Sequence, residues 1–409
     1  MKKQTKNIPQ LRFPEFKGEW TKISLRDKAC KIGSGITPKG GSRVYQDTGI
    51  IFIRSQNVNQ NMLILDNATY ISEELHTSMK GSAVAPNDIL LNITGASIGR
   101  SCVVPTDIKV ANVNQHVCII RLEETQIAHF YQLLLSSFKG QKLVFQAQAG
   151  GGREGLNFQN ISSFKIFIPT FPEQQKIASF LSVVDKKIQQ LTRKRELLEK
   201  YKKGVMQKIF SQEIRFKDEN GKDYPDWEEK KLGDLGKIIT GKTPNTTDLG
   251  LWGGKVQFVT PSDIKKEGKY QDLTERYVIK NSKIKILPIG SILYTCIASI
   301  GKMSISVKPC ITNQQINAIV SNGDVLNEYI FYALLSVTSR ILATRATTTL
   351  PIINKTEFSK IMIVVPYSKK EQQKIASFLS GIDDKKEQIQ FQITQTQSFK
   401  KALLQRMFA

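Results

Sequence analysis

Two long segments of the chain carry apolar residues at alternating steps of four and three positions, which is the spacing of a heptad repeat. The first segment runs from Ile177 to Ile209 and the second from Ile375 to Met407, with a few basic residues and threonines at seam positions. Such a narrow seam favours two helices paired as a coiled coil over amphipathic helices that each lie on their own globule. The predicted seam residues are Ile177, Leu181, Val184, Ile188, Leu191, Leu198 and Val205 in the first segment, and Ile375, Leu379, Ile382, Ile389, Ile393 and Leu403 in the second.

The sequence that precedes each of these segments has a different pattern. Short β-rich runs, such as "GIIFIRS" at residues 49–55 and "VCIIRL" at residues 117–122, alternate with turns rich in Gly, Pro, Asn and Ser, and a helical stretch follows at residues 128–138. This pattern predicts an α+β globule of about 160 to 170 residues, a usual size for one domain.

The chain is a tandem duplication. The segment "EQQKIASFLS" occurs at residues 173–182 and again, unchanged, at residues 371–380, and "ASIGR" at residues 96–100 is echoed by "ASIGK" at residues 298–302. The first helix leaves the first globule toward the second, and the second helix can return along it. We therefore expect an antiparallel coiled coil and pseudo-two-fold symmetry.

The duplication predicts four parts in the order globule, helix, globule, helix. We expect the first globule at residues 1–172, a central helix at 173–212, the second globule at 213–370 and a C-terminal helix at 371–409. From Ile177 to Ile209 the first helix should rise roughly 48 Å, at about 1.5 Å per residue.

The charge of the chain indicates a polyanionic partner. Its 59 Lys and Arg residues exceed its 36 Asp and Glu residues, which leaves a net charge of +23. Residues 1–172 hold 20 basic and 12 acidic residues, and residues 211–370 hold 23 and 16. Since both globules are basic, the distribution predicts two separate contacts with nucleic acid rather than a basic tail.

One short motif suggests a nucleotide-binding P-loop. In "LGKIITGKTP", residues 235–244, Gly236, Gly241, Lys242 and Thr243 have the required spacing. A P-loop also needs a helix directly after the Thr, whereas turn-forming residues follow here. The corresponding first-copy segment "KIGSGITP", residues 31–38, lacks the Lys and the leading Gly. We interpret the match as accidental and the shared Gly-x-Thr-Pro as a turn.

Further chemistry is not predicted within this chain. The Pro-Pro of an adenine methyltransferase motif is absent, and the three histidines, His76, His116 and His129, all lie in the first copy. The five cysteines contain no Cys-x-x-Cys pair, which argues against a metal site or a disulfide framework. We therefore expect no catalytic residue, metal or cofactor here. The apolar runs are short and no signal segment is apparent, so we expect a cytoplasmic protein.

The duplicated globules and helices resemble the specificity subunit of type I restriction-modification systems over essentially the whole chain. The domain-to-helix junctions "IFIPTFPEQQKIASFL" at residues 166–181 and "MIVVPYSKKEQQKIASFL" at residues 362–379 carry the resemblance. The Gly-x-Thr-Pro and Ser-Ile-Gly-Arg/Lys elements also resemble the family's. The second junction departs from the family pattern only in having Lys369 and Lys370 in place of a Pro.

The resemblance implies two target recognition domains that bind a bipartite, asymmetric site on double-stranded DNA. It also implies partner subunits: two methyltransferase subunits that use S-adenosylmethionine, and restriction and translocase subunits that use ATP and Mg. Two alternatives remain open at this point. One is the specificity subunit of a type IIB-like system, and the other, from a different functional class, is a nuclease or ATPase with duplicated DNA-binding domains.

Candidate contact residues come from positions that the two copies share. Polar residues in turns after strands are expected to contact bases, and the cations after Gly in "SIGR" and "SIGK" are expected to contact phosphates. The exposed glutamines of the repeated segment are expected to bind the methyltransferase. The predicted DNA-binding residues are Thr37, Arg54, Ser55, Gln56, Asn57, Arg100, Arg153, Thr243, Thr260, Ser262, Asp263, Lys302 and Arg345, and the predicted partner-binding residues are Gln174, Gln175, Gln372 and Gln373.

Overall fold

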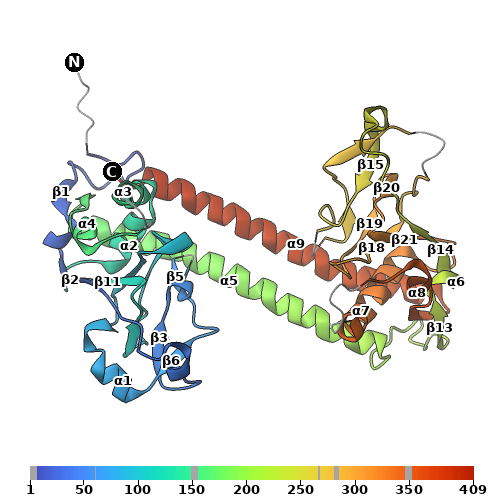
Figure 1. The fold of residues 1–409 in the computed structure, drawn as a ribbon, viewed down its shortest axis with the longest axis horizontal. Helices are drawn as coiled ribbons and strands as arrows, with labels where there is room; N and C mark the ends of the chain where they lie inside the picture. The colour runs from blue at the N-terminus through green and yellow to red at the C-terminus, as the bar shows by residue number, and fades with distance from the viewer. Residues whose placement is uncertain (1–6, 60, 149–154, 266–267, 281–284, 346–351) are drawn as a thin grey trace. The chain divides into compact units, whose positions relative to one another are not determined.

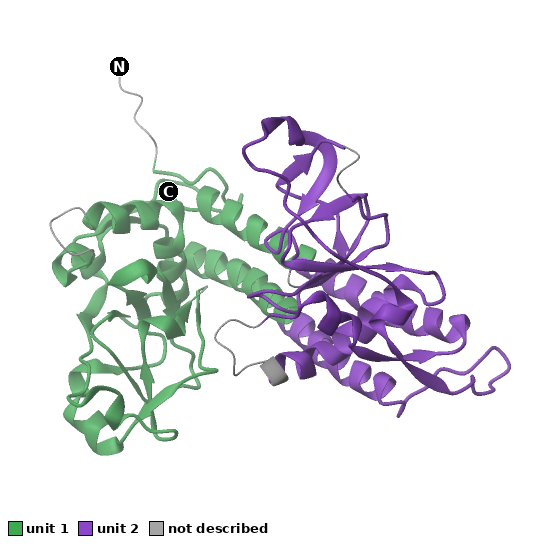
Figure 2. Ribbon diagram, turned by 45° about the vertical axis from the view of Figure 1, so that its right-hand side comes forward, with its two compact units in different colours: residues 1–192, 391–409 green, residues 193–390 purple. Residues whose placement is uncertain are grey.

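The computed structural model describes residues 7–59, 61–148, 155–265, 268–280, 285–345 and 352–409. The chain forms two compact units (Figure 2). Unit 1 contains residues 1–192 and 391–409, and unit 2 contains residues 193–390. Two long helices, α5 (Phe171–Phe210) and α9 (Lys369–Arg406), each contribute residues to both units (Figure 1).

Unit 1 is built on two four-stranded sheets. The first has the order β2 (Ala29–Ser34), β11 (Val117–Leu122), β8 (Ile89–Asn92), β9 (Ser101–Val103), and all its neighbours are antiparallel. The second has the order β6 (Thr69–Ile71), β3 (Ile50–Ile53), β10 (Ala111–Val113), β7 (Ala83–Val84), with β3 and β10 parallel. Two shorter ladders pair β1 (Thr21–Ser24) with β12 (Lys165–Ile168) and β4 (Val58–Asn59) with β5 (Met62–Leu63). Besides α5, the helices are α1 (Glu73–Ser78), α2 (Ala128–Ser136), α3 (Phe138–Ala147) and α4 (Phe158–Ser162).

Unit 2 repeats this arrangement. Its larger sheet has the order β14 (Gly236–Thr240), β21 (Ile316–Ser321), β18 (Ile292–Thr295), β19 (Met303–Ser306), β16 (Tyr270–Gln271). A second sheet has the order β17 (Arg276–Val278), β15 (Trp252–Val259), β20 (Cys310–Thr312), and β13 (Trp227–Lys231) pairs with β22 (Met362–Pro366). The remaining helices are α6 (Leu232–Leu235), α7 (Asn327–Arg345), α8 (Lys355–Ser359) and α9. The parallel pair β15–β20 corresponds to β3–β10, so the duplication predicted from the sequence is confirmed.

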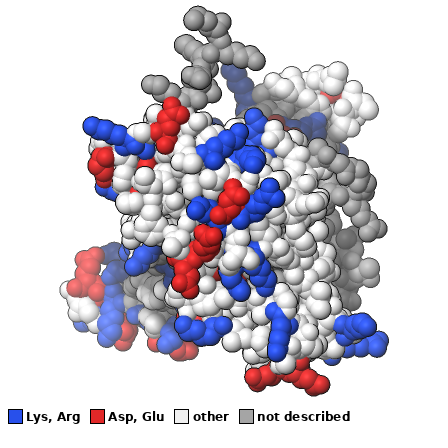
Figure 3. All heavy atoms as spheres, turned by 90° about the vertical axis from the view of Figure 1, so that its left-hand side faces the viewer, with Lys and Arg blue, Asp and Glu red and all other residues white. Residues whose placement is uncertain are grey.

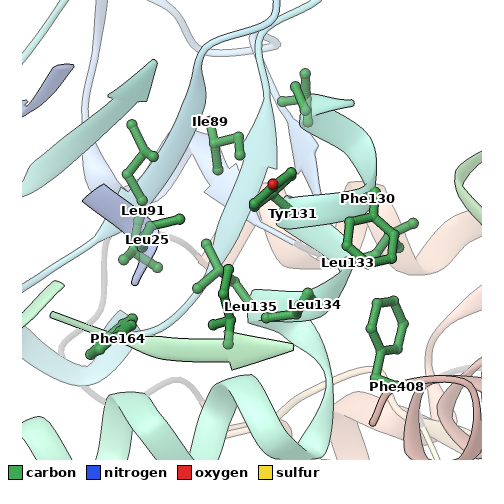
Figure 4. Close-up of a cluster of buried hydrophobic side chains, with 14 of the residues drawn as sticks. Leu25, Ile89, Leu91, Phe130, Tyr131, Leu133, Leu134, Leu135, Phe164 and Phe408 are labelled. Atoms are coloured by element: carbon green, nitrogen blue, oxygen red, sulfur yellow. The ribbon is translucent and has the colours of Figure 1, made fainter. Parts of the chain in front are cut away.

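The core of unit 1 includes the start of α5 and the end of α9. Figure 4 shows apolar residues from β8 and α2 gathered in this core, with Phe408 facing Phe130. The Phe408 ring lies 5.6 Å from Phe130 and 6.3 Å from Trp20. Leu403 and Leu404 of α9, and Met407 just after it, are buried in the same cluster as Ile177 and Leu181 of α5.

The core of unit 2 has the reciprocal composition. It contains the start of α9, with Ile375 and Leu379, and the end of α5, with Met206 and Ile209. Phe210, the residue equivalent to Phe408, stacks 5.9 Å from Tyr329. Each globule therefore holds the start of its own helix and the end of the helix from the other repeat. The predicted pairing of the two helices is confirmed within each unit, and the seam residues near the helix ends, such as Ile177 and Ile375, also belong to the globule cores.

Ion pairs show that α5 and α9 run antiparallel within each unit. In unit 2, Lys202 lies 2.6 Å from Asp383 and Lys386 contacts Glu199, and in unit 1 Lys400 lies 2.5 Å from Asp185. The two residue numbers add to 585 in all three pairs, as an antiparallel register requires. The two Lys–Asp pairs occupy equivalent positions in the repeat. The seam lysines are buried, and their charges are matched by the opposing helix.

Candidate nucleic-acid interface

In both units the Gly-x-Thr-Pro turn packs against the loop that follows the second strand of the parallel pair, which is β10 in unit 1 and β20 in unit 2. Thr243 Oγ1 donates to Gln314 Oε1 at 2.7 Å, and Thr37 makes the equivalent contact with Gln115. The glycines are required by close approach of the two loops. A Cβ at Gly35 would lie 1.6 Å from the Val113 carbonyl oxygen, and one at Gly241 would lie 2.2 Å from that of Asn313.

Those loops contain functional candidates that the sequence reasoning missed. His116 Nδ1 lies 2.6 Å from Thr94 Oγ1, and its Nε2 lies 3.1 Å from Gln115 Nε2. In unit 2 the equivalent residue is Gln315, which accepts a hydrogen bond of 2.8 Å from Asn313 Nδ2. The Asn-Gln pair that both copies share was the available sequence signal, because a repeated polar pair at a strand end indicates a retained loop.

A second loop follows β3 in unit 1 and β15 in unit 2. The last predicted residue of this loop shapes it in both copies: Asn57 Oδ1 accepts from the Arg54 amide at 2.9 Å, and Asp263 Oδ2 accepts from the Thr260 amide at 2.7 Å. Asn57 is also only 4% exposed. The exposed side chain in this loop is that of the preceding residue in each copy, Gln56 and Ser262.

The other predicted residues of these loops make contacts of their own. Ser55 is half-buried, and its carbonyl accepts from Asn92 Nδ2 at 2.8 Å. Thr260 Oγ1 lies 2.8 Å from Ser262 Oγ. The Arg54 guanidinium lies over the Tyr45 ring at 5.8 Å.

The cation of the Ser-Ile-Gly-Arg/Lys element contacts strand β4, directly after the second loop, in unit 1, and the second loop itself in unit 2. Arg100 Nη1 donates to Asn59 Oδ1 at 3.2 Å, and Lys302 Nζ donates to the Pro261 carbonyl at 3.2 Å. The glycine before each cation has a positive φ, 83° at Gly99 and 93° at Gly301, a conformation that favours glycine. Each unit therefore gathers a Gly-x-Thr-Pro turn, a polar loop and a cation.

Two predicted DNA contacts cannot be placed. Arg153 lies outside the described residues, and Arg345 ends α7 without a described side chain. The P-loop interpretation is excluded by the local structure, because the element after Thr243 is a short 3-10 turn at Leu249–Leu251 rather than an α-helix. Within the described ranges, no group of three or more His, Cys, Asp and Glu side chains could hold a metal ion. The search of those same ranges found no helix that could span a membrane.

The repeated "EQQKIASFLS" segment is partly structural. Glu173 accepts two hydrogen bonds of 2.8 Å from the Arg12 guanidinium, which raise the pKa of Arg12 above its usual value. Glu371 makes the equivalent ion pair with Arg215 at 3.1 Å.

The expectation that all four glutamines are exposed is wrong for the first of each pair. Gln174 is 3% exposed and donates to the Pro169 carbonyl, and Gln372 is 1% exposed and donates to that of Pro366. These amides satisfy backbone carbonyl groups that lie shortly before the start of each helix. Gln175 and Gln373 are exposed.

The charged side chains are distributed rather than concentrated on the face drawn in Figure 3. Lys and Arg side chains alternate there with Asp and Glu across an otherwise uncharged surface. On this face, then, the net positive charge forms no single basic patch.

The chain matches known specificity proteins along most of its length. The family model for the type I restriction modification DNA specificity domain matches residues 17–200 and 224–396. The specificity subunit of the type I restriction enzyme HindI from Haemophilus influenzae is 24% identical, with 85% of this chain and 90% of that protein covered. The putative type I restriction enzyme MjaX specificity subunit of Methanocaldococcus jannaschii is also 24% identical and covers 92% of this chain and 90% of that protein. A third relative, the MjaIX specificity subunit of the same organism, is 34% identical, but the match spans only 42% of its length.

Solved structures share the fold. The S subunit of a type I restriction-modification system from M. genitalium superposes with a TM-score of 0.61 at 15% identity, covering 98% of this chain and 99% of that one. The two occurrences of the family domain coincide with the two copies of the repeat. These matches favour the specificity-subunit interpretation over a nuclease or ATPase. The chain belongs to the family of type I restriction-modification DNA specificity subunits.

Proposed function

We propose that each unit reads one half of a bipartite, asymmetric site on double-stranded DNA, and that the chain itself performs no chemistry. One observation carries the proposal: the two loop clusters share their supporting contacts but differ in the side chains they present. Thr37 and Thr243 make equivalent hydrogen bonds, whereas Gln56 is replaced by Ser262 and His116 by Gln315. Equivalent supports with different exposed polar groups suit two readers of unlike sequences.

The proposed division between base and phosphate contacts follows from exposure. Gln56 and Ser262 would contact base edges, since they are the exposed side chains of their loops. Arg100 and Lys302 would contact phosphates, because their position after a shared glycine is the same in both units. Asn57 and Asp263 would act by holding the loop in shape.

The proposed partners are two methyltransferase subunits and restriction and translocase subunits. S-adenosylmethionine, ATP and Mg would be bound by those partners. One of the solved structures that shares this fold is described as the structural basis of "complex assembly" in a type I system. In this chain, the repeated segment offers two equivalent helix starts at which a partner could dock. Exposed Gln175 and Gln373 are the proposed contacts. We also propose that the complex works in the cytoplasm.

Selection from a random library of duplex DNA tests the proposed function. The chain, purified alone and with its methyltransferase, should enrich one motif with two defined halves and an undefined gap. Adenine methylation should require the methyltransferase. Enrichment of no motif by either preparation would overturn the proposal, and so would methylation by the chain alone.

A further inference from the structure

Unit 2 contains a cavity of about 770 Å³ beside the Gly-x-Thr-Pro turn. Its apolar wall includes Leu251, Leu287 and Ile311. Its charged lining residues are Lys242, Lys285 and Asp248, and Asp248 Oδ1 accepts a hydrogen bond of 3.0 Å from the Gly250 amide. Ligand sites in proteins have volumes of about 300 to 1,000 Å³ and combine apolar walls with a few polar groups. The volume and the lining therefore suit a small organic anion.

A buried hydroxyl lines this cavity without a hydrogen-bond partner. Thr312 is 2% exposed, and its Oγ1 is unpaired. An unpaired buried hydroxyl is unfavourable, so it needs an explanation. The fold does not require it, because Val113 occupies the equivalent position of the first copy. Gly241 packs directly against this hydroxyl, since a Cβ there would lie 2.2 Å from its oxygen.

Lys285, which lines the cavity, has two further lysines as neighbours. The ammonium of Lys285 lies beside that of Lys237, with Lys355 also close, and these neighbours lower the pKa of Lys285. None of the three forms an ion pair with a carboxylate in the part of the chain that the structure describes. The first copy differs, because Lys31, the equivalent of Lys237, donates to the Gly81 carbonyl at 2.9 Å. The cavity lining holds two lysines against one carboxylate, and this excess of positive charge favours a bound anion.

We propose that this cavity binds a nucleoside phosphate, with its phosphate at Lys242 and Lys285, its base against the apolar wall, and the Thr312 hydroxyl bonded to a polar edge of the base. The site is not a P-loop, because no α-helix begins directly after Thr243, so the proposal is of binding without hydrolysis. The nucleoside phosphate comes either from a free nucleotide or from a strand of DNA held by the neighbouring loops. The second source rests on the proposed function, and the first does not.

Calorimetric titration of the full chain with AMP tests the proposal. We expect saturable binding that Thr312→Val weakens about fivefold, the effect of losing one hydrogen bond, and that Lys285→Ala weakens about tenfold. Thr312→Val should leave the thermal unfolding midpoint unchanged or raised, because it introduces the residue that the first copy carries. Lys39→Ala, in the equivalent loop of unit 1, is the matched control and should bind AMP as the unmodified chain does.

Two results would overturn the proposal. One is the absence of AMP binding at about millimolar concentration. The other is binding of inorganic phosphate as tight as that of AMP and insensitive to Thr312→Val, which would indicate unspecific attraction to lysines. Competition by a duplex of random sequence identifies a DNA strand as the source, and AMP binding unaffected by the duplex identifies a free nucleotide. Loss of duplex binding with intact AMP binding would contradict the proposed function alone.

Discussion

At the scale of single residues, the repeat separates side chains that support a loop from those that the loop presents. Asn57 and Asp263 are bonded to their own loops, while Gln56 and Ser262 are exposed. The sequence predicted all of these as base contacts, because position in a turn does not reveal the direction of a side chain. Burial and hydrogen bonding make that distinction.

Arg100 and Lys302 should contribute to DNA affinity without contributing to sequence preference. Replacing either with Ala should weaken binding to all duplexes alike and lower the slope of log affinity against log salt by about one, the effect of one lost phosphate contact. Fluorescence anisotropy over a salt series measures this. Lys203→Ala, on the exposed surface of α5, is the control and should leave the slope unchanged. A change in the preferred sequence would argue against a phosphate contact.

The seam ion pair Lys202–Asp383 should stabilise the chain more than a surface pair does. The Lys202 side chain is 9% exposed, and burial lowers its pKa while Asp383 opposes that shift. Removing one partner leaves the other charge partly buried, so Lys202→Met should destabilise the chain by about 2 to 4 kcal/mol. Denaturant unfolding of the two single variants and the double variant measures the coupling.

The exposed pair Arg193–Glu196 is the matched control for this cycle. Its side chains are 62% and 52% exposed, and such pairs contribute about 0 to 1 kcal/mol. An equal coupling energy for the two pairs would show that burial of Lys202 and Asp383 adds nothing to their interaction.

At the scale of elements, the long helices were the most predictable part of the chain. Their heptad spacing indicated the seam, and the structure places α5 and α9 antiparallel in each unit. Strands β3 and β11 also lie where the apolar runs predicted them. The contacts made by the helix ends were not predictable, because a heptad pattern does not show that Phe210 and Phe408 enter globule cores.

The repeated segment has two faces with different roles, which leads to a prediction about docking. Gln174→Glu or Gln372→Glu should lower the stability of the chain, since those amides are buried. Gln175→Glu together with Gln373→Glu should instead leave stability unchanged and weaken methyltransferase binding at least tenfold. Size-exclusion chromatography with light scattering measures the assembly, and thermal unfolding provides the control. If the double variant Gln175→Glu, Gln373→Glu still formed an intact complex with two methyltransferases, this docking site would be refuted.

At the scale of the whole molecule, the sequence predicted the duplication and the family, whereas the loop interface required coordinates. The charge surplus indicated nucleic acid but did not reveal where it would bind. The contacts of the equivalent turns, such as Thr243 with Gln314, join segments 71 residues apart that no local pattern connects. Comparison of the two copies distinguishes the side chains that support these loops from those that the loops expose.

Residues 1–212 alone should form a homodimer that reads a palindrome. In such a dimer Asp185 of one copy would face Lys202 of the other, since the two Lys–Asp pairs occupy equivalent repeat positions. The end of α5 would also replace the end of α9 in the core, with Phe210 in the place of Phe408. Two identical readers related by a two-fold axis require a palindromic site. Light scattering and selection from a duplex library check this, and a stable, sequence-specific monomer would contradict it.

The central claim is that one chain carries two independent readers of different half-sites. Mapping N6-methyladenine across genomic DNA, after treatment with the chain and its methyltransferase, tests this most directly when the unmodified chain is compared with Gln56→Ala and Ser262→Ala. We predict one bipartite motif for the unmodified chain, with Gln56→Ala relaxing one half only and Ser262→Ala relaxing the other half only. A single contiguous motif, or a change in both halves caused by either substitution, would contradict the account.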